Sequence, residues 1–182
     1  MMQPARIAIK MFIVMLVLLG LIYPLFITLV SQVTMPKEAG GSLIKQRDKW
    51  VGSELIGQNF RGENYFWPRP SAVDYDPIKP AGGSNLGPTS AKLQEAVGRR
   101  IEKSSPHLPA DLAYASASGL DPHITLEGAY YQVDRVAKNR FLTEDQLRSL
   151  IMSLSEGVEH KYVNVLRLNI ALDQQFTPES HE

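Results

Sequence analysis

The stretch MFIVMLVLLGLIYPLFITLV, residues 11–30, contains twenty uncharged residues in a row and is the only such run in the chain. Fourteen of these residues are Leu, Ile, Val or Phe. At about 1.5 Å per residue, a helix of this length spans roughly 30 Å, the thickness of the hydrocarbon core of a bilayer. We therefore predict one transmembrane helix over residues 11–30, preceded by a short N-terminal tail over residues 1–10.

A cleaved signal peptide is the main alternative to a permanent anchor. The apolar region of a signal peptide is about 7–15 residues long and ends at a small-x-small cleavage site. The run is longer here, and the best candidate site, Leu29-Val30-Ser31, has a large residue where a small one is needed. We therefore expect an anchor that is not cleaved.

The flanking charges indicate the orientation of this helix. Arg6 and Lys10 precede it without any acidic residue, whereas the charges that follow it are spread out and of both signs. A compact basic cluster is retained on the cytoplasmic side of a membrane. We therefore expect a cytoplasmic N-terminus and an extracytoplasmic domain after the helix.

One face of the predicted helix is suited to packing against other helices. Gly20, Pro24 and Thr28 are spaced four apart, so they lie on the same side. Small residues at this spacing allow helix backbones to approach closely in lipid. Gly and Pro are also simply common in membrane helices, so the pattern has a plain alternative explanation. We take these three residues as a candidate docking face.

Composition excludes several classes of function for the remainder of the chain. Arg6 and Lys10 are two of the 19 basic residues, so the part after the helix has 17 basic and 19 acidic residues. This balance does not favour binding to nucleic acid or to an anionic membrane surface. The chain has no cysteine, which excludes disulfides, thiolate metal ligands and cysteine nucleophiles.

After a linker at residues 31–41, residues 42–182 are predicted to form one α+β domain with short strands and long ordered loops. Strand-like pieces occur near residues 42–44 and 51–56. Residues 58–90 are rich in Pro and Gly but also contain five aromatic residues, which a disordered linker would lack. This composition indicates a long ordered loop that is held by aromatic packing, and such loops are often functional.

Helical periodicity is strongest in the second half of this domain. One helix is predicted from about residue 89 to 101, a break over residues 103–124, and a second helix over residues 126–140 with Thr125 as its cap. Thr143 and Gln146 fit a capping box for a third helix, which Gly157 is expected to stop. Residues 163–172 alternate like a strand, but Asn164 could instead cap a final helix.

Motifs that would carry chemistry are absent or weak. There is no P-loop, no Asp-Lys-Thr-Gly phosphorylation sequence and no Thr-Val-Gly-Tyr-Gly potassium filter. His123 and Glu127 have the spacing of two metal ligands on a helix, but the expected helix begins at Thr125 and leaves His123 outside it. The glycine-rich residues 82–87 could hold an anion, although an ordered turn is the simpler reading. We expect no catalytic residues and no metal site.

Several longer strings resemble one known family. They are GSLI (41–44), GSELIGQNF (52–60), YFWPRPSA (65–72), GGSNL (82–86), SASGLD (116–121), YQVDRVA (131–137), VNVL (163–166) and LD (172–173), together with YP (23–24) in the apolar run. In this order they closely resemble the C subunit of the Kdp potassium-transporting P-type ATPase. The similarity extends over nearly the whole chain.

This resemblance implies an accessory subunit of an ATP-driven potassium importer of the inner membrane. The implied partners are a channel-like potassium-binding subunit, a P-type ATPase subunit and a small membrane subunit. The implied role is to assemble or stabilise the complex and to raise its affinity for ATP, as a "catalytic chaperone". With the domain outside, an effect on cytoplasmic ATP would have to be coupled through these partners.

Two other functions remain open at this point. The first is a subunit that binds ATP directly, in a ternary complex with the ATPase subunit; Ser118 and Gly119 are the weak local candidates for nucleotide contact. The second is a membrane-anchored extracytoplasmic enzyme, which would need a clustered acid–base or metal site in the folded domain.

Overall fold

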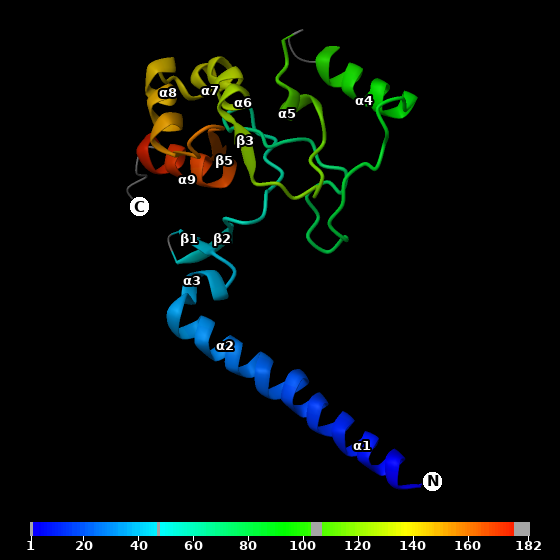
Figure 1. The fold of residues 1–182 in the computed structure, drawn as a ribbon. Coiled ribbons are helices and arrows are strands. Elements are labelled where there is room, and N and C mark those ends of the chain that lie inside the picture. The colour runs from blue at the N-terminus through cyan, green and yellow to red at the C-terminus, as the bar shows by residue number, and fades with distance from the viewer. Residues whose placement is uncertain (1, 47, 103–106, 177–182) are drawn as a thin grey trace. The chain divides into compact units, whose positions relative to one another are not determined.

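The computed structural model describes residues 2–46, 48–102 and 107–176, and it divides into two compact units, residues 1–51 and 52–182 (Figure 1). We describe each unit by itself. Met1 of the predicted tail, Arg47, and residues 103–106 and 177–182 of the predicted domain lie outside the described residues.

The first unit begins with one long helix. It consists of α1 (Met2–Val17), the π-helical segment η1 (Leu18–Ile22) and α2 (Tyr23–Thr34). The stretch Gln3–Thr34 is long and apolar enough to cross a membrane, and its side chains are exposed, as a lipid-facing helix requires. The predicted N-terminal apolar helix is therefore confirmed, and it extends past residue 30.

A short helix and a hairpin follow, and the second strand of the hairpin ends two residues past the boundary of this unit. Helix α3 (Pro36–Ala39) occupies part of the stretch that was predicted as a linker. Gly41, at φ +82°, turns the chain into β1 (Leu43–Gln46), which pairs with β2 (Lys49–Ser53). The two strand-like pieces of the sequence are thus confirmed, with shifted bounds.

The second unit is an α+β domain around a small antiparallel sheet of order β3–β5–β4. These strands are β3 (His123–Thr125), β4 (Ser155–Glu156) and β5 (Tyr162–Asn164). Ile124 pairs with Val163 at the centre, and both side chains are buried. The predicted fold class is therefore confirmed.

Six helices accompany this sheet in the described part of the second unit. They are α4 (Ala91–Glu102), α5 (Ala110–Ala113), α6 (Leu126–Tyr131), α7 (Val133–Arg140), α8 (Glu144–Ser153) and α9 (Val165–Phe176). Helices α6 to α9 gather around the sheet in Figure 1. Their apolar faces form the core with Val133, Leu147, Ile151, Leu168 and Leu172, all fully buried.

Local signals in the sequence predicted two helix starts correctly. The Thr125 hydroxyl accepts a hydrogen bond from the Gly128 N–H, as expected of a cap. Thr143 and Gln146 form the predicted capping box at α8. Asn164 caps α9 by accepting from the Arg167 N–H at 3.1 Å, so the predicted helix is confirmed there. The alternative strand prediction for residues 163–172 holds only for Val163 and Asn164, which belong to β5.

Two expectations about helix ends were wrong. The predicted helix over residues 126–140 is divided at Gln132, whose side-chain amide donates to the Gly128 carbonyl. The backbone N–H of Gln132 bonds to Ala129 instead, and the helix tightens there. Helix α8 ends at Ser153, before Gly157, which at φ +89° shapes the turn between β4 and β5.

The break predicted between helices over residues 103–124 is described from residue 107 onward. It contains the one-turn helix α5.

Candidate functional site

The aromatic loop of residues 58–90 is ordered because two buried amide side chains hold its backbone. Asn169 on α9 accepts from the Phe66 N–H at 2.9 Å and donates to the Phe66 carbonyl at 3.0 Å. Gln132 does the same for Trp67, at 2.7 and 3.1 Å. Each amide therefore satisfies both backbone groups of one residue, as a neighbouring strand would. Phe66 is fully buried in the core between these two attachments.

Two arginines of α7 continue this attachment along the loop. The guanidinium of Arg135 lies 3.6 Å from the ring centroid of Trp67 and donates to the carbonyls of Glu63 and Tyr65. Arg140 pairs with Asp173 at 2.6 Å, and the Tyr65 hydroxyl donates to the same carboxylate. Burial of its guanidinium lowers the pKa of Arg135. The contacts of the two arginines fix the loop on the helical layer by hydrogen bonds as well as by ring packing.

A cleft of about 980 Å³ opens beside this attached loop. Its walls come from residues 59–75 of the loop, from α4 and α5, and from the junction of α6 and α7. We call it the arginine–aromatic cleft. It is lined by four arginines, Arg61, Arg69, Arg100 and Arg135, and by the rings of Phe60, Trp67, Tyr75 and Tyr131.

Three of the four arginines face a carboxylate, and Arg100 differs. The pairs are Arg61–Asp74 at 3.3 Å, Arg69–Asp121 at 3.0 Å and Arg135–Glu63 at 3.8 Å. Arg100 donates to the Ala113 carbonyl at 2.6 Å, and no acidic side chain of the described residues lies within 4.0 Å of its nitrogens. Burial, with repulsion from Arg99, lowers the pKa of Arg100. Among the residues that the structure describes, Arg100 is therefore the arginine of the cleft without a carboxylate partner.

Tyr75 closes one side of this cleft. Its hydroxyl donates to the Arg69 carbonyl, and burial, supported by the nearby Asp121 charge, raises its pKa well above the usual range. It is therefore a neutral hydrogen-bond donor at physiological pH.

Ser118 and Gly119, the candidates for nucleotide contact, lie in a turn that joins two loops. The Gly119 N–H donates to Ser116 and its carbonyl accepts from the Ser71 hydroxyl at 2.6 Å. The Ser118 carbonyl accepts from Gly82, which belongs to the glycine-rich stretch. Gly119 is at φ +70°. These backbone atoms are occupied in loop packing, and a nucleotide role for the two residues stays a prediction.

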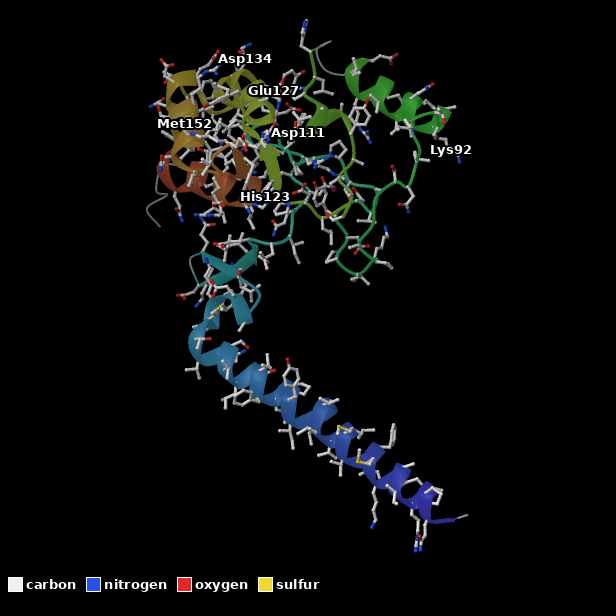
Figure 2. The ribbon with its side chains drawn as sticks, viewed as in Figure 1. Lys92, Asp111, His123, Glu127, Asp134 and Met152 are labelled. Atoms are coloured by element: carbon white, nitrogen blue, oxygen red, sulfur yellow. The ribbon has the colours of Figure 1, made fainter. Side chains whose placement is uncertain are left out.

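His123 and Glu127 do not come together as a pair of metal ligands. His123 lies on β3, where its ring packs edge-on against Tyr162 at 4.9 Å, while Glu127 is on the first turn of α6. Figure 2 shows both residues with Asp111, whose carboxylate accepts from the N–H and the hydroxyl of Thr125. Within the described ranges no group of three His, Cys, Asp or Glu side chains could hold a metal ion.

The candidate docking face in the apolar helix coincides with a defect in its backbone. Pro24 has no N–H, and the Tyr23 N–H bonds to Leu18, five residues back, within η1. In a regular α-helix, the Tyr23 N–H would bond to the Leu19 carbonyl and the N–H of residue 24 to the Gly20 carbonyl. Here the first is diverted to Leu18 and the second is absent, because residue 24 is proline. No atom lies within 4 Å of a Cβ built on Gly20, so this part of the surface is open.

Thr28 does not repair this defect. Its hydroxyl donates to the Pro24 carbonyl at 2.8 Å, one turn closer to the C-terminus of the helix. In lipid, carbonyls without a donor are costly unless a neighbouring helix or water supplies one. Gly20, Pro24 and Thr28 thus mark a face where a polar group of another helix would be stabilising.

Sequence reasoning missed the residues that organise the cleft. Gln132 and Arg135 fall in the string 131–137, which was noted only for its family resemblance, and Arg100 falls in the helix predicted from about residue 89 to 101 without being singled out. The loop partners of Gln132 and Arg135 lie 65 to 72 residues away in the chain. No local pattern signals such pairs.

Comparisons with known proteins point to one family. A family model described as KdpC, the K+-transporting ATPase c chain, matches residues 5–174. The chain is 46% identical over 182 residues to a potassium-transporting ATPase KdpC subunit of Dechloromonas aromatica, covering 92% of this chain and 95% of the relative. The corresponding subunit of Geotalea uraniireducens is 43% identical over 187 residues, covering 95% and 98%. That of Geobacter sulfurreducens is 45% identical over 187 residues, covering 94% and 98%.

Proposed function

The chain belongs to the KdpC family of K+-transporting ATPase subunits, and on this premise we propose that it is a non-catalytic accessory subunit that assembles and stabilises the complex and promotes ATP use by the ATPase subunit. The observation that carries the proposal is the family match over residues 5–174, which includes both the apolar helix and the α+β domain. The described residues contain one membrane-length helix, and the sequence has no phosphorylation or filter motif, so moving an ion would require partners.

The partners in this proposal are the channel-like potassium-binding subunit, the P-type ATPase subunit and the small membrane subunit. The apolar helix contacts them through the face of Gly20, Pro24 and Thr28. Support comes from the open surface at Gly20 and from the carbonyls that lose their donors next to Pro24. A side-chain donor on a partner helix would satisfy these carbonyls, which water cannot reach in lipid.

The orientation in this proposal is a cytoplasmic N-terminus and a periplasmic domain in the inner membrane. Arg6 and Lys10 support it, because basic residues are retained on the cytoplasmic side. In this orientation the domain does not touch ATP, and its effect on ATP use is a coupling free energy transmitted through the partners.

Protease added to intact spheroplasts separates this proposal from direct ATP binding. With a tag at the C-terminus, digestion of residues 42–182 is expected, while a cytoplasmic marker protein stays intact. Protection of the tagged domain until the spheroplasts are lysed would contradict the orientation and favour a cytoplasmic nucleotide-binding domain. Digestion excludes that alternative, including a nucleotide role for Ser118 and Gly119.

A further inference from the structure

We propose that the arginine–aromatic cleft receives an acidic segment of a partner subunit, whose carboxylate binds the guanidinium of Arg100. This inference rests on the proposed function, because it names the chemistry of one contact within the complex. Nothing in the membrane helix is needed for it, since every residue that lines the cleft belongs to the second unit.

The charge of Arg100 is the first argument. Guanidinium has five N–H donors, and the described contacts of Arg100 use one nitrogen on the Ala113 carbonyl. The remaining donors form the fork that binds a carboxylate through two parallel hydrogen bonds. The neighbouring cation Arg99, which pairs with Glu95 at 3.9 Å, adds repulsion to Arg100 rather than compensation. An incoming carboxylate would therefore meet a positive charge that has already lost part of its hydration.

The size and the walls of the cleft are the second argument, and they favour a peptide segment over a free ion. A volume of about 980 Å³ is at the upper end of small-molecule sites and accommodates several residues. Apolar walls surround the charged group, from Phe60, Trp67, Pro68, Leu108, Leu112 and Tyr131. Aromatic residues and arginine are enriched at the buried centre of protein interfaces.

The rigidity of one wall is the third argument. Gln132 bonds to both backbone groups of Trp67, and the guanidinium of Arg135 lies over the indole ring, 3.6 Å from its centroid. The wall is therefore formed before any partner binds, and a segment that enters the cleft does not have to order it.

Photocrosslinking in the assembled complex tests this proposal. A p-benzoylphenylalanine is placed at Tyr131, which lines the cleft, or at Tyr114, which is exposed and does not line it. The complex is purified from membranes and irradiated, and crosslinked peptides are identified by mass spectrometry. We expect a crosslink from position 131, and not from 114, to a partner segment that contains Asp or Glu.

The role of the charge is tested by a pair of neighbouring variants. Arg100→Gln keeps a polar side chain but removes the charge, and it is expected to lower the crosslink yield about tenfold, as loss of a charged hydrogen bond does. Arg99→Gln, which changes the adjacent exposed arginine, should leave the yield unchanged. Arg100→Lys keeps the charge but lacks the fork, so its yield should lie between those of the unmodified chain and Arg100→Gln. An equal amount of each variant in the purified complex excludes a folding defect as the cause of the loss.

Each outcome has a distinct meaning. Equal crosslinking in Arg100→Gln and Arg99→Gln, a crosslink to a segment without acidic residues, or no crosslink in an intact complex would overturn this proposal and leave the proposed function standing. Failure of the unmodified chain to assemble with the other subunits would overturn the proposed function and this inference together.

Discussion

Gln132 and Trp67 are joined by two hydrogen bonds, because the amide of Gln132 accepts from the Trp67 N–H at 2.7 Å and donates to its carbonyl at 3.1 Å. The same amide divides the α6–α7 helix by taking the Gly128 carbonyl. One side chain therefore sets both the shape of the helical layer and the position of the aromatic loop against it.

We expect Gln132→Ala to lower the free energy of unfolding by about 2–4 kcal/mol, since each buried backbone group left without a partner costs ~1–3 kcal/mol. Urea denaturation of the full chain in detergent, followed by tryptophan fluorescence, measures this loss. Gln94→Ala, an exposed glutamine on α4, is the matched control and should change stability by less than about 0.5 kcal/mol. Equal losses in the two variants would show that the amide does not hold the loop.

A pair of glycine substitutions tests the packing at the start of α6. A Cβ at Gly128 would lie 2.8 Å from the Asp111 carboxylate, which is held by Thr125, so Gly128→Ala should destabilise the domain by about 1–3 kcal/mol. Gly98 on α4 has no atom within 4 Å of a built Cβ, and Gly98→Ala should instead stabilise by about 0.5–1 kcal/mol. Thermal unfolding of both variants shows whether each substitution raises or lowers the stability of the domain. A stabilising Gly128→Ala would contradict the contact with Asp111.

The raised pKa of Tyr75 predicts a loss of stability in alkali. Above its ordinary pKa of about 10, this tyrosine loses its proton in the unfolded chain but keeps it in the folded one, so stability is full below that pH and falls as pH rises. One such group adds a slope of at most ~1.4 kcal/mol per pH unit. Urea midpoints between pH 8 and 11 should fall less steeply in Tyr75→Phe than in the unmodified chain. If the urea midpoints of the two proteins fell equally steeply with pH, the raised pKa of Tyr75 would be contradicted.

The proposed docking face of the apolar helix predicts that Gly20→Leu reduces assembly without harming the isolated chain. The new side chain meets no atom of its own helix but would block close approach of another. Co-purification of the other Kdp subunits should fall about tenfold, which corresponds to ~1.4 kcal/mol. Ile22→Phe enlarges the opposite side of the helix and serves as the control. If both variants co-purify their partners equally well, the face of Gly20, Pro24 and Thr28 is not the contact.

Local chemistry made part of this fold predictable. Three predicted features depend only on neighbouring residues of the sequence, and all three are present. They are the apolar run, the Thr125 cap and the Thr143–Gln146 capping box. The ordered nature of the aromatic loop was also predicted, although its main cause was not. Ring packing buries Phe66, but the backbone is held by amides 65 and 103 residues away.

The cleft depends on contacts of the same long-range kind. Arg100, Trp67 and Tyr131 lie on separate elements, and only the folded chain brings them to one site. Gly157 illustrates a local signal that was assigned to the wrong element. Its turn-forming character was predicted to stop helix α8, but that helix ends earlier, at Ser153. That Arg100 has no carboxylate partner among the described residues could not be inferred from a helix pattern. This property depends on where the acidic side chains lie in the folded chain.

Potassium-stimulated ATP hydrolysis by the purified complex tests the central claim most directly. The other three subunits are expressed with or without this chain, purified through a tag on the ATPase subunit, and assayed over a range of ATP concentrations. We predict that the subunits purified without this chain assemble poorly and lose potassium-stimulated hydrolysis, most strongly at low ATP. An intact complex with the same hydrolysis at every ATP concentration in its absence would contradict the account.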